Sequence, residues 1–155
     1  MIHLLEKADI FSLDVQAIVN PVNCVGVMGG GLAKAFADRY PAYLKRYKKL
    51  CEYGLIEIGR PFFHMIGYQP PKHRFSESFI VSFATKLHWK DPSKLGYIVD
   101  AMQKFCDSLN GFEVESVAIP ALGCGLGGLK WEKVRPVIEN GLTGYKGNTY
   151  LIAPQ

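Results

Sequence analysis

The chain has 155 residues, 48% of them hydrophobic, and a formal net charge of +4. A chain of this length and composition can bury one sizeable core, so we expect a single domain over residues 1–155. No apolar run approaches the ~20 residues that a membrane-spanning helix needs, and residues 1–11 lack the apolar segment of a signal peptide. These features argue against a membrane protein and predict a cytoplasmic protein, which we expect to be a monomer. The mild positive charge permits an anionic partner such as nucleic acid.

The cysteines and histidines do not follow the spacing of a metal site. Cys24, Cys51, Cys106 and Cys124 include no C-x-x-C pair. Their spacing argues against a zinc ribbon or a thioredoxin-like site and suits a reducing compartment. The histidines also lack the spacing of metal ligands. We therefore expect no metal and no cofactor.

Strand and helix patterns alternate along the chain. Strand-type runs are expected at residues 2–7, 16–19, 60–66, 79–83, 117–121 and 148–153. The second of these runs is expected to end at Asn20 and Pro21. Apolar residues have helical spacing at residues 32–40, 41–54, 94–109 and 131–142, and Pro136 is expected to delay or kink the last helix. This alternation predicts an α/β fold of three layers, in which helices cover both faces of a mixed, largely parallel sheet.

Two glycine-rich loops follow strand-type runs. The first, NPVNCVGVMGGGLA at residues 20–33, opens a helix, and the second, GCGLGG at residues 123–128, precedes the helix that starts near Trp131. Glycines let a backbone approach a ligand closely, and the free N–H groups at a helix start favour an anion. Both loops should lie at the carboxyl ends of the strands, where such sheets bind ligands. We expect them to converge on one phosphate or diphosphate; the alternative is that they are turns between core elements.

The second loop does not fit other known phosphate motifs. Gly123, Gly125 and Gly128 satisfy G-x-G-x-x-G, but the acidic residue that a Rossmann site needs ~20 residues further on is missing. The chain also lacks G-x-x-x-x-G-K-[ST], so a P-loop is not supported. Cys124 has no arginine in its loop to hold a transferring phosphate. We therefore interpret Cys124 as a small loop residue, not as a phosphatase nucleophile.

The second predicted helix has a basic face. Its cations are Lys45, Arg46, Lys48 and Lys49. Such a run is either a solvated surface or a contact for nucleic acid, and the sequence leaves both interpretations open.

Four segments together resemble the macrodomain superfamily, whose ligand is ADP-ribose. They are Asp9 and Ile10 after the first strand, AIVNPVN at residues 17–23, GVMGGGLA at residues 26–33, and PALGCGLGGLKW at residues 120–131. Within this superfamily, VSFATKLHWKDPSKL at residues 81–95 and the segment GCGLGGLKW are similar to the DNA ADP-ribosyl glycohydrolases. These are antitoxins that reverse thymidine ADP-ribosylation. A related deacylating branch, which acts on ADP-ribosyl glutamate, has an acidic residue where this chain has Gly127.

The resemblance implies a macrodomain fold and assigns roles to individual residues. Asp9 would accept a hydrogen bond from the adenine amino group beside the backbone of Ile10, and the two glycine loops would wrap the diphosphate. Asn20 and Asn23 would fix the distal ribose and the first loop. The residues expected to bind ADP-ribose are Asp9, Ile10, Asn20, Asn23, Gly26, Val27, Met28, Gly29, Gly30, Gly31, Leu32, Gly123, Cys124, Gly125, Leu126, Gly127 and Gly128. Gly30 departs from relatives that often carry lysine there, which removes a side-chain contact but not the backbone cradle. Without the resemblance, Asp9 would be interpreted as a turn cap.

Lys86 follows a strand-type run and is expected at the strand end, on the rim of the ligand cleft. A lysine there can attack as an amine or hold a developing negative charge as an ammonium. The resemblance implies that Lys86 is the catalytic residue. His88, Trp89 and Lys90 form a basic, aromatic run that suits contact with DNA, although Trp89 could also be a core residue.

The resemblance implies an enzyme that removes ADP-ribose from modified DNA bases. Its expected partners are ADP-ribose and ADP-ribosylated DNA, and a cognate DNA ADP-ribosyltransferase toxin is a candidate partner. Two alternatives stay open at this point. One is a binding module that reads ADP-ribose without turnover, and the other is a hydrolase of ADP-ribosyl esters on proteins or small molecules.

Overall fold

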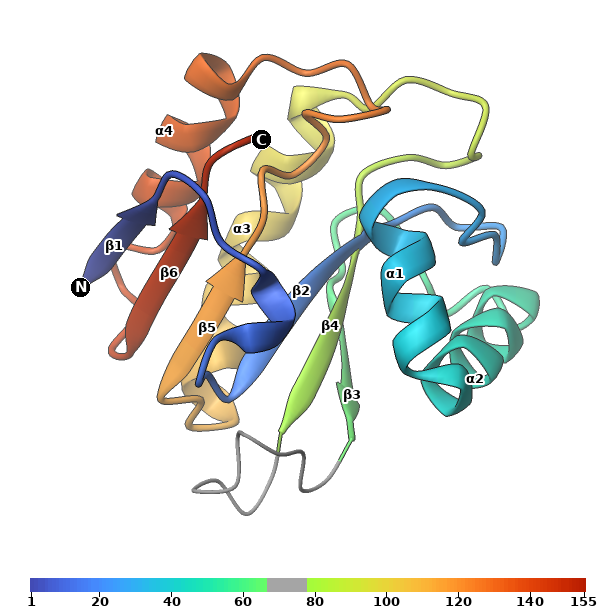
Figure 1. The fold of residues 1–155 in the computed structure, drawn as a ribbon, viewed down its shortest axis with the longest axis horizontal. Helices are drawn as coiled ribbons and strands as arrows, with labels where there is room; N and C mark the ends of the chain where they lie inside the picture. The colour runs from blue at the N-terminus through green and yellow to red at the C-terminus, as the bar shows by residue number, and fades with distance from the viewer. Residues whose placement is uncertain (67–77) are drawn as a thin grey trace.

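The structure, a computed structural model, describes residues 1–66 and 78–155. In these ranges six strands form one sheet in the order β1-β6-β5-β2-β4-β3. The strands are β1 (Ile2–Leu5), β2 (Ala17–Val22), β3 (Phe62–Met65), β4 (Phe79–Ala84), β5 (Ser116–Ile119) and β6 (Asn148–Ile152). Neighbouring strands are parallel except at one edge, where β3 pairs antiparallel with β4 (Figure 1). The prediction of a mixed, largely parallel sheet is therefore confirmed.

Helices cover both faces of this sheet. They are α1 (Gly31–Arg39), α2 (Pro41–Glu52), α3 (Leu95–Gly111) and α4 (Trp131–Gly141), and a short 3-10 helix, η1 (Ile10–Ser12), follows β1. Phe36 of α1 belongs to the core on one face and Phe105 of α3 to the core on the other. Because successive strand residues face opposite sides, Ile18 joins the first core and Val19 the second. The structure thus has the predicted three layers.

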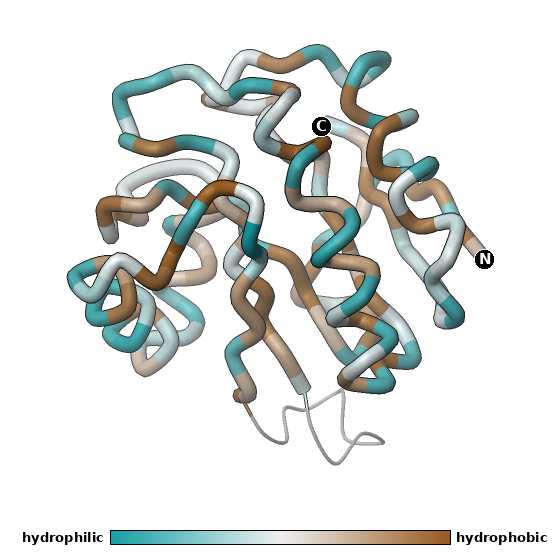
Figure 2. Tube along the Cα trace, turned by 180° about the vertical axis from the view of Figure 1, so that it is seen from behind, coloured by the Kyte–Doolittle hydropathy of each residue, from teal (hydrophilic) through white to brown (hydrophobic). Residues whose placement is uncertain are grey.

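The hydropathy of the elements fits this arrangement. In Figure 2 the central strands are largely brown, whereas the helices alternate between brown and teal. This is expected when strands are buried on both faces and each helix buries one side. In the part of the chain that the structure describes, no helix is both long and apolar enough to cross a membrane.

The structure contradicts the predicted strand end at Asn20 and Pro21 and the predicted delay of the last helix by Pro136. The second strand continues through Asn20 and Pro21 to Val22. The carbonyl of Val22 accepts a hydrogen bond from Thr85 on the β4 side, so by alternation the backbone of Pro21 faces the β5 side. Strand β5 pairs with β2 only at Ala17 and Ile18, and a residue without an N–H is therefore tolerated there. Pro136 does not delay α4 either, because it lies inside a helix that begins at Trp131.

Candidate functional site

A cavity of about 1010 Å³ opens where β2 and β5 separate. Pro21 and Val22 at the end of β2 line one side of it, and Pro120 and Ala121 after β5 line the other. All five parallel strands contribute, since residues at or just after the carboxyl ends of β1, β4 and β6 complete the wall. This is the position where open α/β sheets bind ligands, and the volume suits a molecule the size of a dinucleotide.

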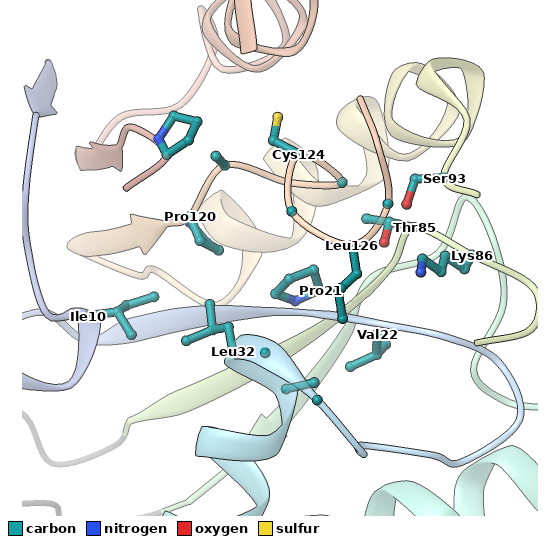
Figure 3. Close-up of a pocket in the computed structure, with 18 of the residues that line it drawn as sticks. Ile10, Pro21, Val22, Leu32, Thr85, Lys86, Ser93, Pro120, Cys124 and Leu126 are labelled. Atoms are coloured by element: carbon teal, nitrogen blue, oxygen red, sulfur yellow. The ribbon is translucent and has the colours of Figure 1, made fainter. Parts of the chain in front are cut away.

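Most of the predicted site residues line this cavity. They are Asp9, Ile10, Asn23, Val27, Gly29, Gly30, Gly31, Leu32, Lys86, Trp89, Gly123, Cys124, Gly125, Leu126 and Gly127. Figure 3 shows Ile10 at one end of the cavity and Lys86 at the other, with Leu32 and Leu126 between them. The structure therefore places the residue predicted beside adenine, Ile10, and the predicted catalytic residue, Lys86, at opposite ends, with residues of the two glycine loops between them.

Six predicted contacts lie off the cavity wall. They are Asn20, Gly26, Met28, His88, Lys90 and Gly128. Asn20 is fully buried, and its Nδ2 contacts Met28 Sδ at 3.8 Å and donates to the Tyr43 hydroxyl at 3.1 Å. In this structure Asn20 thus supports the first loop from below and does not reach the wall, where a ribose contact was expected.

Helix α2 holds the first loop through two tyrosines one turn apart. The Tyr43 hydroxyl accepts the hydrogen bond from Asn20, and the Tyr47 hydroxyl donates to the backbone oxygen (2.7 Å) and to Oδ1 (3.0 Å) of Asn23. The Asn23 side chain in turn bonds both the amide (3.4 Å) and the carbonyl (2.8 Å) of Val27. Sequence reasoning missed these tyrosines, because at helical spacing they look like ordinary core residues.

The network below the first loop continues to the edge strand. Tyr43 OH lies 2.7 Å from Ser82 Oγ, which lies 2.8 Å from His64 Nε2. Burial raises the pKa of Tyr43 to about 12 and also raises that of Tyr47, so both hydroxyls keep their protons. Burial, with a smaller effect of Arg46, lowers the pKa of His64 to about 4. At neutral pH the network is therefore uncharged.

The start of α1 forms the anion-binding part of the first loop. The N-cap residue, Gly30, supplies no side-chain hydrogen bond to the first turn, so the N–H groups of that turn stay available. Gly31, Leu32 and Ala33 of this turn line the cavity. A helix N-terminus of this kind attracts a phosphate through its free N–H groups and its dipole.

The second loop contributes its own amides instead of a helix start. Helix α4 begins at Trp131, which does not line the cavity, so the expected helix N-terminus is not part of this wall. The amides of Gly125, Leu126 and Gly127 make no backbone hydrogen bond within residues 1–66 and 78–155. The Leu126 side chain is 80% exposed and reaches toward the first loop, where a Cβ on Gly30 would lie 3.5 Å from its Cδ1. The two loops therefore converge, as predicted.

Gly127 is fixed against the segment that carries Lys86. The amide of Ser93 donates to the carbonyl of Gly127 at 3.0 Å. A Cβ at position 127 would collide with Ser93 Oγ and would lie 2.6 Å from the carbonyl oxygen of Gly123. No side chain fits there, so this glycine is a steric requirement of the loop.

Lys86 lies on the cavity wall just after β4. Its Nζ donates to the carbonyl of Trp89 at 3.4 Å, and in the described ranges it forms no salt bridge. Cys24 ties this segment to the first loop, because its Sγ contacts Lys86 O at 3.5 Å and its amide donates to Leu87 O at 3.1 Å. Asp9 and Lys86 are the charged side chains of the described wall. Asp9 directly precedes Ile10, which lies at the opposite end from Lys86 in Figure 3.

Trp89 is half-exposed at the Lys86 end, so its interpretation as a core residue is wrong. Lys90 Nζ lies 5.2 Å from the centroid of the Trp89 ring, and the His88 ring lies 5.4 Å from it. His88 and Lys90 therefore flank the aromatic wall residue without lining the cavity themselves. The three form a basic, aromatic cluster at the cavity mouth.

Asp9 both caps a turn and lines the cavity. Its Oδ1 accepts a hydrogen bond from the amide of Phe11 at 3.0 Å, which starts η1, and its exposed carboxylate stays open to a second donor. The cap interpretation is therefore correct, and it is compatible with the site.

Several wall residues were not predicted from the sequence. They are Ala8, Pro21, Val22, Ala33, Thr85, Ser93, Pro120, Ala121, Ile152, Ala153, Pro154 and Gln155. Most are small or apolar residues next to strand ends, and nothing in their local pattern distinguishes a wall from a core. For some of them, such as Ala33 and Ala121, the sequence offered one signal, namely that they lie within or close to a predicted glycine loop in the sequence.

Comparisons with known proteins agree with this geometry. The Macro domain family model matches residues 19–138. A DNA ADP-ribosyl glycohydrolase of Mycobacterium tuberculosis is 43% identical over 129 residues, which cover 83% of this chain and only 35% of that protein. The solved macrodomain of Mycobacterium tuberculosis DarG has 37% identity and a TM-score of 0.90, with 100% of this chain and 98% of that chain covered. Thermosipho africanus DarTG, solved in complex with ADP-ribose, has 29% identity and a TM-score of 0.89 and covers 99% of this chain and 41% of its own. The chain belongs to the macro domain family.

Proposed function

We propose that this protein is a DNA ADP-ribosyl glycohydrolase that removes ADP-ribose from modified bases of the thymidine type. The observation that carries this proposal is the position of Lys86, at the end of the cavity opposite Ile10 and beside exposed Trp89. The matching relatives support the same activity. We also propose a cognate DNA ADP-ribosyltransferase toxin as its protein partner, because one relative is a fusion of such a transferase with a DNA ADP-ribosyl glycohydrolase.

The ligand has one orientation that matches the charges of the wall. Its adenine lies at Asp9 and Ile10, where the free carboxylate oxygen accepts from the exocyclic amine. Its diphosphate lies between the first turn of α1 and the amides of the second loop. Its distal ribose then reaches Lys86, and the DNA base attached to that ribose leaves past Trp89.

Hydrolysis breaks the bond between the anomeric carbon and the base nitrogen. The electron pair of that bond goes to the base, the base takes up a proton, and water supplies the hydroxyl that the anomeric carbon receives. As an ammonium, Lys86 holds the negative charge that develops on the leaving base. As an amine, it instead bonds to the anomeric carbon as the base leaves, and the bond from that carbon to the ring oxygen then breaks to give an imine with Lys86. Water hydrolyses the imine, which releases the sugar and restores the amine.

One assay distinguishes this proposal from the two alternatives. The protein is incubated separately with ADP-ribosylated DNA and with ADP-ribosylated protein, and released ADP-ribose is measured. We expect release from the DNA. Release from the protein alone would identify an ester hydrolase, and binding of ADP-ribose without release from either substrate would identify a binding module.

Lys86→Ala is expected to keep ADP-ribose affinity and to lower turnover on ADP-ribosylated DNA at least ~100-fold, the lower range for a positioned proton-transfer group. Lys104→Ala is the matched control, since it removes an exposed lysine of α3 that does not line the cavity. Borohydride added during turnover separates the two roles, because only an imine with Lys86 is reduced to a stable adduct. Wild-type turnover in Lys86→Ala would refute the mechanism.

A further inference from the structure

Helix α2 carries a dense and unneutralised positive charge. Its four cations, Lys45, Arg46, Lys48 and Lys49, stand against one carboxylate, Glu52. In α1, by contrast, Lys34 pairs with Asp38 at 2.8 Å, and in α4 Arg135 pairs with Glu139. In the described ranges no cation of α2 forms a salt bridge. Like charges three and four residues apart destabilise a helix, so this face suits an anionic partner.

A second hollow, a groove between α2 and the first loop, lies next to this face. It has a volume of about 420 Å³ and is lined by Cys24, Val25, Gly26, Lys48, Cys51 and Glu52. Lys48 of α2 therefore forms one wall, and Cys24 on the other side contacts the carbonyl of Lys86. Figure 1 shows α2 close to the loop that links β2 to α1. Cys24 thus lines this groove and also contacts the backbone of the predicted catalytic lysine.

At this groove the first loop packs closely against α2. Gly26 has a φ of +84°, and a Cβ there would lie 3.6 Å from the Cα of Lys48. Val25, a lining residue, is 46% exposed, and Leu87, whose carbonyl accepts from the amide of the lining residue Cys24, is 52% exposed. Apolar groups next to cations are the combination that holds bases and phosphates of a nucleic-acid strand.

We propose that this groove and the basic face of α2 bind the DNA strand that flanks the modified nucleotide. This proposal rests on the proposed function, because it starts from a modified nucleotide at Lys86. The flanking strand leaves the cavity past Cys24, passes Val25 and Leu87, and places its phosphates at Lys48 and Lys45. The cavity then recognises the ADP-ribose, and α2 supplies affinity for DNA that does not depend on base sequence.

The test compares two double variants with the same change of net charge. Lys45→Glu/Lys48→Glu alters the groove side, and Lys104→Glu/Lys133→Glu alters exposed positions on α3 and α4, across the sheet. Each is assayed on an ADP-ribosylated oligonucleotide and on ADP-ribosylated thymidine, which has no flanking phosphates. We expect the ratio of kcat/KM for the oligonucleotide to that for the nucleoside to fall about tenfold in the groove variant only. Added salt should also lower its activity on the oligonucleotide less steeply. In a plot of log kcat/KM against log salt concentration, the slope should become shallower by about 0.7 for each phosphate that the variant no longer binds.

A second measurement is independent of turnover. Fluorescence anisotropy with the unmodified oligonucleotide should show weaker binding in the groove variant than in the α3/α4 variant. Equal effects of the two double variants in both experiments would overturn the proposed path. If the wild type releases no ADP-ribose from either substrate, the proposed function fails, while the anisotropy comparison still decides whether the groove binds DNA.

Discussion

Asp9 combines a structural and a binding role in one carboxylate. One oxygen caps η1 through the amide of Phe11, and the other is free for the ligand. Asp9→Asn removes the negative charge. If its one oxygen stays at the cap, its NH2 group, a donor, takes the place of the oxygen that faces the ligand. By calorimetry we expect both Asp9→Asn and Asp9→Ala to lose about 1 to 3 kcal/mol of ADP-ribose binding, the scale of a charge-assisted hydrogen bond. Wild-type affinity in Asp9→Asn would remove this residue from the site.

His64 makes the fold sensitive to acid. Its pKa falls from an ordinary 6.5 to about 4 in the folded protein, because burial disfavours the charged ring. Below pH 6.5 the unfolded chain takes up a proton that the folded chain does not, so stability is lost as the pH falls from 6.5 toward 4 and levels off below. The loss is roughly 3 kcal/mol for this shift.

Denaturant unfolding at a series of pH values measures this effect. His64→Gln removes the titrating ring, so its free energy of unfolding should decline less steeply than that of the wild type across this window. Parallel curves for the two proteins would show that other groups cause the acid sensitivity.

At the scale of elements, α2 acts as a template for the first loop. Tyr47→Phe removes the hydroxyl that holds Asn23, and Tyr145→Phe removes a buried hydroxyl that donates to Val114 O at 2.5 Å in the core on the other face. Each should cost about 1 kcal/mol of stability for one hydrogen bond. We expect only Tyr47→Phe to weaken ADP-ribose binding as well, by about 3- to 10-fold in calorimetry. Equal affinities of the two variants would mean that the loop keeps its shape without α2.

The shape of the second loop depends more on Gly127 than on Gly125. At Gly127 even a methyl group meets Ser93 and the carbonyl of Gly123, whereas a Cβ at Gly125 meets nothing within 4 Å. Gly127→Ala should therefore lower the free energy of unfolding by about 1 to 3 kcal/mol, the usual cost of overpacking, and Gly125→Ala should leave it nearly unchanged. Thermal denaturation of both variants checks this. An acidic residue at position 127, as in the related deacylating branch, would need a different path of this loop.

At the scale of the whole molecule, the sequence predicted the three layers and the two glycine loops. It did not predict the gap between strands β2 and β5 in which the cavity lies. Periodicity and glycine loops are local signals, and they located α3 and the start of α1 to within a few residues. The separation of β2 from β5 after Ile18 depends on which strands become neighbours, and no short segment encodes that choice. For the same reason, Asn20 could be recognised as part of a motif, but its burial under the loop could not.

Because all five parallel strands end at the cavity, the binding site exists only when the whole sheet is assembled. Partial unfolding that detaches β1 or β6 removes Ile10 or Ile152 from the wall and releases the ligand. Binding energy is therefore linked to global stability and not to one local unit: ligand at 100 times its Kd adds about 2.7 kcal/mol to the free energy of unfolding. A bound nucleotide thus raises the cooperativity of the domain. It should protect amides of the five parallel strands, from β1 to β4 in the sheet order, from hydrogen exchange, but not those of antiparallel β3, which does not reach the wall.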